Sequence, residues 1–220
     1  MIVERSMHPS WLSNAYVLAG EAGGAAVFVD SGAPLEPLLA VVEEQRLTPT
    51  HLLVTHGHAD HVAGNDELVE RFGLEVTSGG VETDGLRVEV HKTPGHSDDG
   101  VSFVVADACF TGDTLFRDSV GGGPGGELRH SVMDVLMTLP HDTRVYPGHT
   151  DETTISREWE ENPFVRYWRG VDPEDGRPCR AVGEEATLLV WSPDYDGKGK
   201  ALVRFADGNE AILGASRLEL

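Results

Sequence analysis

One segment of seven residues constrains the fold and the chemistry of this chain more than any other. It spans residues 55–61 and reads Thr-His-Gly-His-Ala-Asp-His, which places three imidazoles and one carboxylate within six positions. His56 and His58 are two residues apart, so on an extended backbone both side chains point to the same side. Asp60 continues this alternation, whereas His61 points to the opposite side. Imidazole nitrogen and carboxylate oxygen suit zinc and other borderline divalent ions, so the segment predicts two separate pairs of metal ligands after a strand.

The size and the charge of the chain limit the classes of protein to which it can belong. Its 220 residues suffice for one large domain, or for one domain with a small appendage. The formal net charge is −20, and there is no basic stripe that would bind a nucleic-acid backbone. No apolar stretch is long enough to span a bilayer, and the N-terminus lacks the features of a secretory signal. We therefore expect a small-molecule substrate, neither nucleic acid nor membrane as a partner, and a monomer or a dimer.

The chain has two cysteines, Cys109 and Cys179, which are far apart and belong to no Cys-x-x-Cys pair. Cys109 lies in the apolar run of residues 101–110, where a small buried thiol is expected. Two free thiols fit a reducing compartment, so we expect a cytoplasmic protein.

Strands and helices alternate along the first three quarters of the chain, which predicts an α/β protein. Apolar runs predict strands at residues 14–19, 25–30, 51–55, 86–91, 101–110 and 143–146. Helical periodicity predicts helices at residues 35–45, 63–72, 128–139 and 156–168, the last with a kink or break at Pro163. Each candidate metal ligand follows the C-terminal end of an apolar strand, beside glycine or proline. In layered α/β proteins, binding sites gather at such strand ends.

After about residue 172, short strand candidates separated by turn signals replace the alternation of strands and helices. Short strand candidates lie at residues 187–191, 200–205 and 210–213, with turn signals at residues 194–199 and 206–209. We therefore predict a catalytic domain at residues 1–170 and a small antiparallel β-module at residues 171–220 that packs on it.

The candidate ligands form a recognisable series. They are His56, His58, Asp60, His61, His96, Asp113 and His149, and the last three each follow a glycine. In this order the motifs resemble the metallo-β-lactamase superfamily over roughly residues 12–168. Within it the chain is most similar to the glyoxalase II-like (hydroxyacylglutathione hydrolase-like) branch. Two further stretches support that branch: Thr-Gly-Asp-Thr-Leu-Phe at residues 111–116, and residues 153–155 followed by residues 162–164.

The resemblance implies a four-layer αββα fold and two Zn²⁺ ions. His56, His58 and His96 would hold the first ion, Asp60, His61 and His149 the second, and Asp113 would bridge them. Asp60 would also orient a bridging hydroxide, and the reaction would be hydrolysis of a thioester or a related acyl bond. One Fe²⁺, or a mixture of zinc, iron and manganese, is the alternative metal content.

Two other functions remain open at this stage. A mononuclear iron enzyme resembling persulfide dioxygenases would use His56 or His58 with His96 and Asp113 as a facial triad. A non-catalytic metal-binding or interaction protein is the second alternative.

The sequence says little about substrate contacts. Arg117, Asn14 and His130 are candidates, and Trp11 could line the mouth of a pocket. No basic cluster for a glutathione moiety is recognisable, so the acyl group and the thiol of the substrate stay open.

Overall fold

The first half of the chain forms a five-stranded mixed sheet with helices on one face. The computed structural model describes residues 1–83 and 85–220. In the order of pairing, the strands are β1 (Ile2–Met7), β2 (Asn14–Ala19), β3 (Ala25–Val29), β4 (Thr48–Leu53) and β5 (Glu75–Thr77). β1, β2 and β3 are antiparallel neighbours, whereas β3, β4 and β5 run parallel. The helices of this half are α1 (Glu36–Glu44), the short α2 (Ala59–Val62) and α3 (Asn65–Phe72).

A second sheet of six strands faces the first. In the order of pairing, it consists of β14 (Thr153–Thr154), β13 (Arg144–Pro147), β9 (Ala108–Gly112), β8 (Val101–Val105), β7 (Leu86–Lys92) and β6 (Val81–Thr83). β9 and β13 are parallel, and the other pairs are antiparallel. A short pair, β10 (Leu115–Phe116) and β11 (Ser119–Val120), follows β9. The helices here are α4 (Gly125–His130), the π-helical turn η1 (Ser131–Val135), the 3₁₀ turn η2 (Leu136–Thr138), α5 (Ile155–Glu161) and α6 (Pro163–Trp168).

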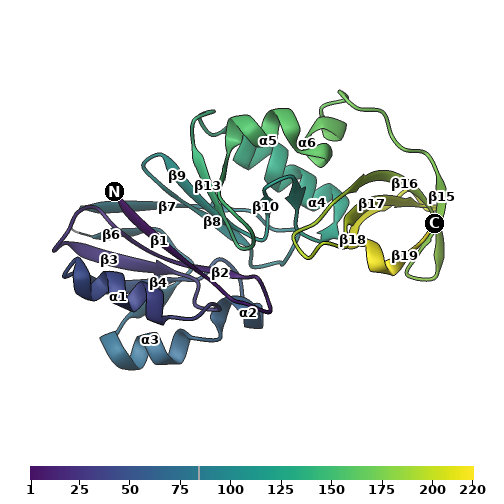
Figure 1. The fold of residues 1–220 in the computed structure, drawn as a ribbon. Helices are drawn as coiled ribbons and strands as arrows, with labels where there is room; N and C mark the ends of the chain where they lie inside the picture. The colour runs from purple at the N-terminus through teal and green to yellow at the C-terminus, as the bar shows by residue number, and fades with distance from the viewer. Residues whose placement is uncertain (84) are drawn as a thin grey trace.

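Alternation of side chains along β2 shows how the layers form. Val17 lies in the apolar cluster that α1 and α3 cover, together with Leu38 and Leu68. Its neighbour Leu18 points to the other face and packs with Phe103 of the second sheet. A third cluster lies between the outer face of the second sheet and its helices. Figure 1 shows the two sheets between two helical layers, with α1 and α3 on one outer face and α5 and α6 on the other. This four-layer helix–sheet–sheet–helix arrangement confirms the predicted fold class.

The C-terminal part forms a third sheet. In the order of pairing, its strands are β12 (Gly123–Pro124), β18 (Glu210–Gly214), β17 (Lys200–Phe205), β16 (Glu184–Ser192), β15 (Pro178–Ala181) and β19 (Leu218–Glu219), and a 3₁₀ turn η3 (Ala215–Arg217) precedes the last. Leu189 and Leu202 of this sheet belong to the same apolar cluster as Leu128 of α4 and Phe164 of α6. The antiparallel β-module is therefore present and packs on the helices beside it (Figure 1). Because β12 joins this sheet from the first part of the chain, the predicted division at residue 170 stays a prediction.

Several predicted boundaries were wrong, each for a local reason. The apolar run at residues 101–110 is two strands, because Ala106 adopts a left-handed φ of 53° and turns the chain between β8 and β9. The helix predicted at residues 128–139 begins at Gly125, inside the glycine-rich segment, and ends in π and 3₁₀ turns. The break at Pro163 is confirmed, since Asn162 Oδ1 accepts hydrogen bonds from the first amides of α6.

The β1 strand, together with β15 and β19, was not predicted from the sequence.

None of the helices in the described ranges combines the length and the apolar character that a bilayer crossing requires.

Candidate metal centre

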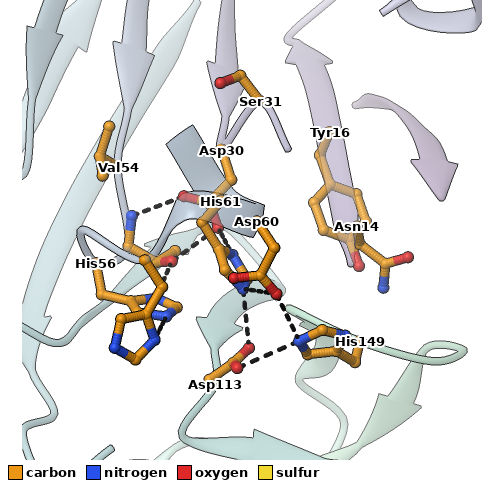
Figure 2. A network of polar contacts seen from close by, with 12 residues as sticks. Asn14, Tyr16, Asp30, Ser31, Val54, His56, Asp60, His61, Asp113 and His149 are labelled. Carbon is orange, nitrogen blue, oxygen red and sulfur yellow. Dashed lines mark hydrogen bonds and ion pairs between the residues drawn. The ribbon is translucent and has the colours of Figure 1, made fainter. Parts of the chain in front are cut away.

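Four strand ends deliver the seven candidate ligands to one place. β4 ends at Leu53, shortly before the His-rich segment, and β7, β9 and β13 end shortly before His96, Asp113 and His149. β9 and β13 run parallel in one sheet, so their C-terminal ends meet at the same edge. The prediction that Asp60 continues an extended backbone was wrong, because Asp60 and His61 lie on the short helix α2. The helical turn still sends both side chains toward the other ligands, as Figure 2 shows.

The first cluster consists of three imidazoles. His56 Nε2 lies 3.1 Å from His58 Nδ1, and His96 Nε2 lies 3.0 Å from the same nitrogen. His96 Nδ1 donates to the carbonyl oxygen of Gly122 at 3.0 Å, which fixes the tautomer and leaves the lone pair of Nε2 pointing at the cluster. Three nitrogens that face one another at such distances form a set that a cation can share.

The second cluster contains Asp60, His61 and His149. Asp60 Oδ2 lies 3.8 Å from His61 Nε2 and 3.6 Å from His149 Nε2. Asp60 is the most exposed member, with 29% of its side chain exposed, whereas the two histidines are buried. The cluster therefore opens to solvent through its carboxylate.

Asp113 lies between the two clusters. Its Oδ1 is 3.3 Å from His61 Nε2, and its Oδ2 is 3.3 Å from His149 Nε2 and 3.4 Å from His96 Nε2. Figure 2 shows this carboxylate below His61 with His149 beside it. One carboxylate thus faces nitrogens of both clusters.

Two polar atoms that face each other at the centre lack hydrogen-bond partners in the protein. Among the described residues, His61 Nε2 and Asp113 Oδ1 are buried without a hydrogen bond, although they face each other. Buried polar atoms in native proteins nearly always have a partner. A divalent cation between a carboxylate oxygen and an imidazole lone pair would satisfy both, so the residues present fit a metal site.

The protonation states of His56, His96 and Asp113 agree with this fit. Burial, and then the neighbouring His61, lowers the pKa of His56 to about 4, and burial lowers the pKa of His96. Both imidazoles are therefore neutral at pH 7, as metal ligands must be. Burial alone would raise the pKa of Asp113, but the imidazoles of His149 and His61, each 3.3 Å from one of its oxygens, hold it well below its usual range.

A buried aspartate, Asp30, contacts the second cluster on the side of His61 that faces away from Asp113. It was not predicted from the sequence. Its Oδ2 lies 2.8 Å from His61 Nδ1, and its two oxygens accept the backbone N–H and the hydroxyl of Thr55 at 2.8 and 2.7 Å. Although burial opposes it, this ion pair and the contact with Asp113 raise the pKa of His61 to about 11, so a metal ion that binds Nε2 must displace a proton from it. Asp30 follows the end of β3, so the rule used for the other ligands would have found it.

Gly148 is required by the crowding around Asp113. A Cβ atom at this position would lie 2.2 Å from Asp113 Oδ1 and 2.8 Å from His61 Cε1. Any other residue would displace the carboxylate that joins the clusters.

The candidate substrate contacts differ in where they lie. Asn14 is buried and donates to the carbonyl oxygens of Pro147 and Thr150 at 2.9 and 2.8 Å, so it holds the loop that carries His149. Arg117 is exposed and has no ion pair within the described ranges. His130 lies at the surface with its Nδ1 2.8 Å from Asp134 Oδ2, apart from both clusters. Trp11 is 45% exposed and stacks on His8.

A residue of the C-terminal sheet reaches the centre as well. The ring of Tyr195, in the loop between β16 and β17, lies parallel to the His149 ring with centroids 4.2 Å apart and an interplanar angle of 7°. Burial, with Asp113 next in size, raises the pKa of its phenol, so the phenol stays protonated. The sequence offered only a turn signal at this position, because turn composition does not reveal what a loop contacts.

Comparison with known proteins identifies the family. Residues 9–79 match the model described as "Metallo-beta-lactamase superfamily". A hydroxyacylglutathione hydrolase of Rhodopseudomonas palustris is 31% identical in a match that covers 91% of this chain and 85% of that protein. The chain belongs to the metallo-β-lactamase superfamily. The relative above is named a hydrolase, and the two clusters are the candidate metal-binding groups of this chain.

Two solved structures share the fold at slightly higher sequence identity. ETHE1 from Myxococcus xanthus is 34% identical with a TM-score of 0.67, and the match covers 74% of this chain and 84% of that chain. The protein TTHA1623, solved in a di-iron-bound form, is 32% identical with a TM-score of 0.61 and covers 72% of this chain and 98% of its own. The family predicted from the motifs is thus confirmed.

Proposed function

We propose that this chain is a dinuclear zinc hydrolase that cleaves a thioester or a related acyl bond. His56, His58 and His96 would hold one ion, Asp60, His61 and His149 the other, and Asp113 would bridge them. The position of Asp113 carries the proposal, since its two carboxylate oxygens lie 3.3 to 3.4 Å from imidazole nitrogens of both clusters. A protein that holds a single ion has no need of two complete ligand sets.

The protein groups explain why such a site would act as a hydrolase. When bound, two divalent ions would polarise a carbonyl oxygen and lower the pKa of a water molecule toward about 7. Asp60 is the one carboxylate of the set that reaches solvent, so it can accept a hydrogen bond from an attacking water and orient it. Asp113 and His61 are buried and held by neighbours, so they keep the site rigid.

The similarity to a hydroxyacylglutathione hydrolase supports a thioester as the substrate. Recognition of glutathione carboxylates would need a lysine or an arginine at the site. Lys200 lies near the centre, but its ammonium already pairs with Asp194 at 3.0 Å and is buried. The proposal therefore leaves the thiol half of the substrate open.

We also propose that the protein is cytoplasmic, which the free thiols of Cys109 and Cys179 favour.

A second candidate function is an iron enzyme, and the relative TTHA1623 of 32% identity was solved in a di-iron-bound form. In a mononuclear iron enzyme that resembles persulfide dioxygenases, His56 or His58 with His96 and Asp113 would hold the iron. That arrangement would leave Asp60, His61 and His149 without a ligand role, although they lie together.

The experiment measures metal content and activity on the same preparation. We expect two equivalents of zinc per chain by mass spectrometry, and hydrolysis of S-lactoylglutathione or of N-acetylcysteamine thioesters without oxygen uptake. One equivalent of iron, with oxygen uptake on glutathione persulfide, would establish the second candidate instead.

Two histidine variants separate catalysis from mere metal binding. His58 is exposed, so His58→Ala should fold normally and lose one metal equivalent with at least about a hundredfold of activity. His130→Ala, which removes another exposed histidine, is the matched control and should retain both. Full activity in His58→Ala would overturn the assignment of the first cluster, and no turnover of any ester by the wild-type protein would favour a non-catalytic metal-binding protein.

A further inference from the structure

The C-terminal sheet contributes an aromatic wall beside the metal centre. Tyr195 stacks on His149, as described above, and its ring also contacts the edge of Phe116 at a centroid distance of 5.6 Å. Aromatic rings in such arrangements attract one another beyond the area that they bury. Tyr195 thus has a defined position on the solvent side of a metal ligand, although it lies in a loop.

A buried ion pair holds this loop in place. Asp194, the neighbour of Tyr195, lies 3.0 Å from Lys200 Nζ and accepts a hydrogen bond of 3.0 Å from the Ser119 hydroxyl. Lys200 is only 6% exposed and donates to the Val120 carbonyl oxygen at 2.7 Å. Burying a charged pair is costly and is a poor means of stabilising a fold, so its use here calls for a positional explanation. The pair ties the loop to β11, next to the metal centre.

A cavity opens between Tyr195 and the segment before β2. Its volume is about 210 Å³, and its lining residues are Met7, Leu12, Thr150, Asp151 and Tyr195. It adjoins the metal centre, because Thr150 follows the ligand His149 and Ser13 pairs with His149 in a β-bridge.

The two opposite sides of this cavity share an unusual backbone. Leu12 has a φ of 58° and Thr150 a φ of 69°, a region that bulky and β-branched residues rarely adopt. Backbone strain of this kind persists where the surrounding structure enforces it, often beside a site. The shape of the cavity is therefore built in by the fold.

We propose that this cavity binds the acyl group of the substrate, and that Tyr195, supplied by the C-terminal sheet, is the residue that selects short uncharged acyl chains. The inference rests on the proposed acyl hydrolysis. The volume corresponds to about seven water molecules and suits a chain of about four to six carbons. The side chains of Met7 and Leu12 and the Tyr195 ring offer apolar contacts. Asp151 at the rim is paired with Arg5 at 3.0 Å, so neither charge is free to bind a carboxylate on the acyl chain.

The test measures how turnover depends on chain length. The substrates are N-acetylcysteamine thioesters of acetate, butanoate, hexanoate and succinate. For the wild-type protein, kcat/KM should rise about fourfold for each methylene up to the capacity of the cavity, and succinate should be a poorer substrate than butanoate, which has the same number of carbons. In Tyr195→Ala and Leu12→Ala the increase should fall below about twofold per methylene, chiefly through KM. Lys198→Ala, an exposed change in the same loop, is the control and should keep the wild-type profile.

A binding measurement separates this inference from the proposed function. The probes are the S-methyl and S-butyl thioethers of N-acetylcysteamine, titrated calorimetrically into wild type, Tyr195→Ala and Tyr195→Phe, each with its metal content checked. Tighter binding of the S-butyl probe that is lost in Tyr195→Ala and kept in Tyr195→Phe would support the subsite even if no thioester is cleaved. Thioester cleavage with a chain-length profile that Tyr195→Ala and Leu12→Ala leave unchanged would overturn the subsite and leave the hydrolase standing.

Discussion

Replacing Asp30 by asparagine should weaken the binding of one metal ion without removing any metal ligand. Asp30 now accepts from the Thr55 amide through Oδ1, and from the Thr55 hydroxyl and His61 Nδ1 through Oδ2. In Asp30→Asn the amide oxygen must face the Thr55 amide, because the opposite orientation sets two N–H donors against each other. The new NH₂ group then points at His61 Nδ1 and donates to it.

That donor would force the wrong tautomer on His61. Its proton would move to Nε2, the nitrogen that faces Asp60 and Asp113, and the lone pair needed for a metal would be lost. Changes behind a ligand of this kind cost about 10- to 100-fold in metal affinity. The lost hydrogen bond to a charged group should also lower the free energy of unfolding by about 1.5–3 kcal/mol.

The assay is a zinc titration against a competing chromophoric chelator, combined with urea unfolding of the metal-free protein. We expect the second zinc equivalent to weaken and the first to stay unchanged. Asp107→Asn is the control, since Asp107 is an exposed aspartate at a strand turn that pairs with Arg144. If each of the two zinc equivalents binds Asp30→Asn as tightly as it binds the wild-type protein, Asp30 does not control the tautomer of His61.

Three further outcomes can be checked on the same protein. Removal of metal with a chelator should lower the melting temperature, because the buried carboxylates then lose their counter-charge; an unchanged melting curve would count against a metal site. Gly148→Ala should push Asp113 aside, destabilise the protein by about 1–3 kcal/mol and abolish binding at both clusters, whereas Gly126→Ala, where a Cβ has open space, should not. Without metal, the free energy of unfolding should be highest near pH 6.5. Between about pH 4 and 6.5, His56 is protonated in the unfolded chain but not in the folded one, so stability falls as the pH is lowered. Between 6.5 and about pH 11, His61 is protonated in the folded chain but not in the unfolded one, so stability falls as the pH is raised. A melting temperature that stays constant from pH 4.5 to 9 would contradict this assignment.

The metal ligands could be predicted from the sequence because their positions follow from local rules. Side chains that follow the C-terminal ends of strands meet at one edge, whatever the details of the loops. This rule places Asp113 and His149 together, although they are 36 residues apart in the chain. It applied equally to Asp30, which was missed because it belongs to none of the motifs that carried the resemblance.

The substrate side could not be predicted in the same way. Tyr195 reaches His149 only because the C-terminal sheet packs beside α4 and α6, and no local pattern in a turn of Asp, Gly and Lys encodes that docking. Likewise, the left-handed turn at Ala106 that divides the run at residues 101–110 into β8 and β9 depends on pairing between the two halves. Contacts that depend on how separate sheets pack are set by tertiary structure, which overrides local propensity.

The same distinction explains how one superfamily can serve many substrates. Asp113 and Gly148 occupy a centre so crowded that a single Cβ would disrupt it, so the metal chemistry tolerates little change. In the cavity beside it, Leu12 comes from the segment before β2 and Tyr195 from a loop of the C-terminal sheet, and neither segment holds a candidate ligand. Substitutions at Leu12 or Tyr195 can therefore alter which acyl group binds while the ligands stay in place, and in this chain the choice of substrate is made by the part that the metal motifs do not describe.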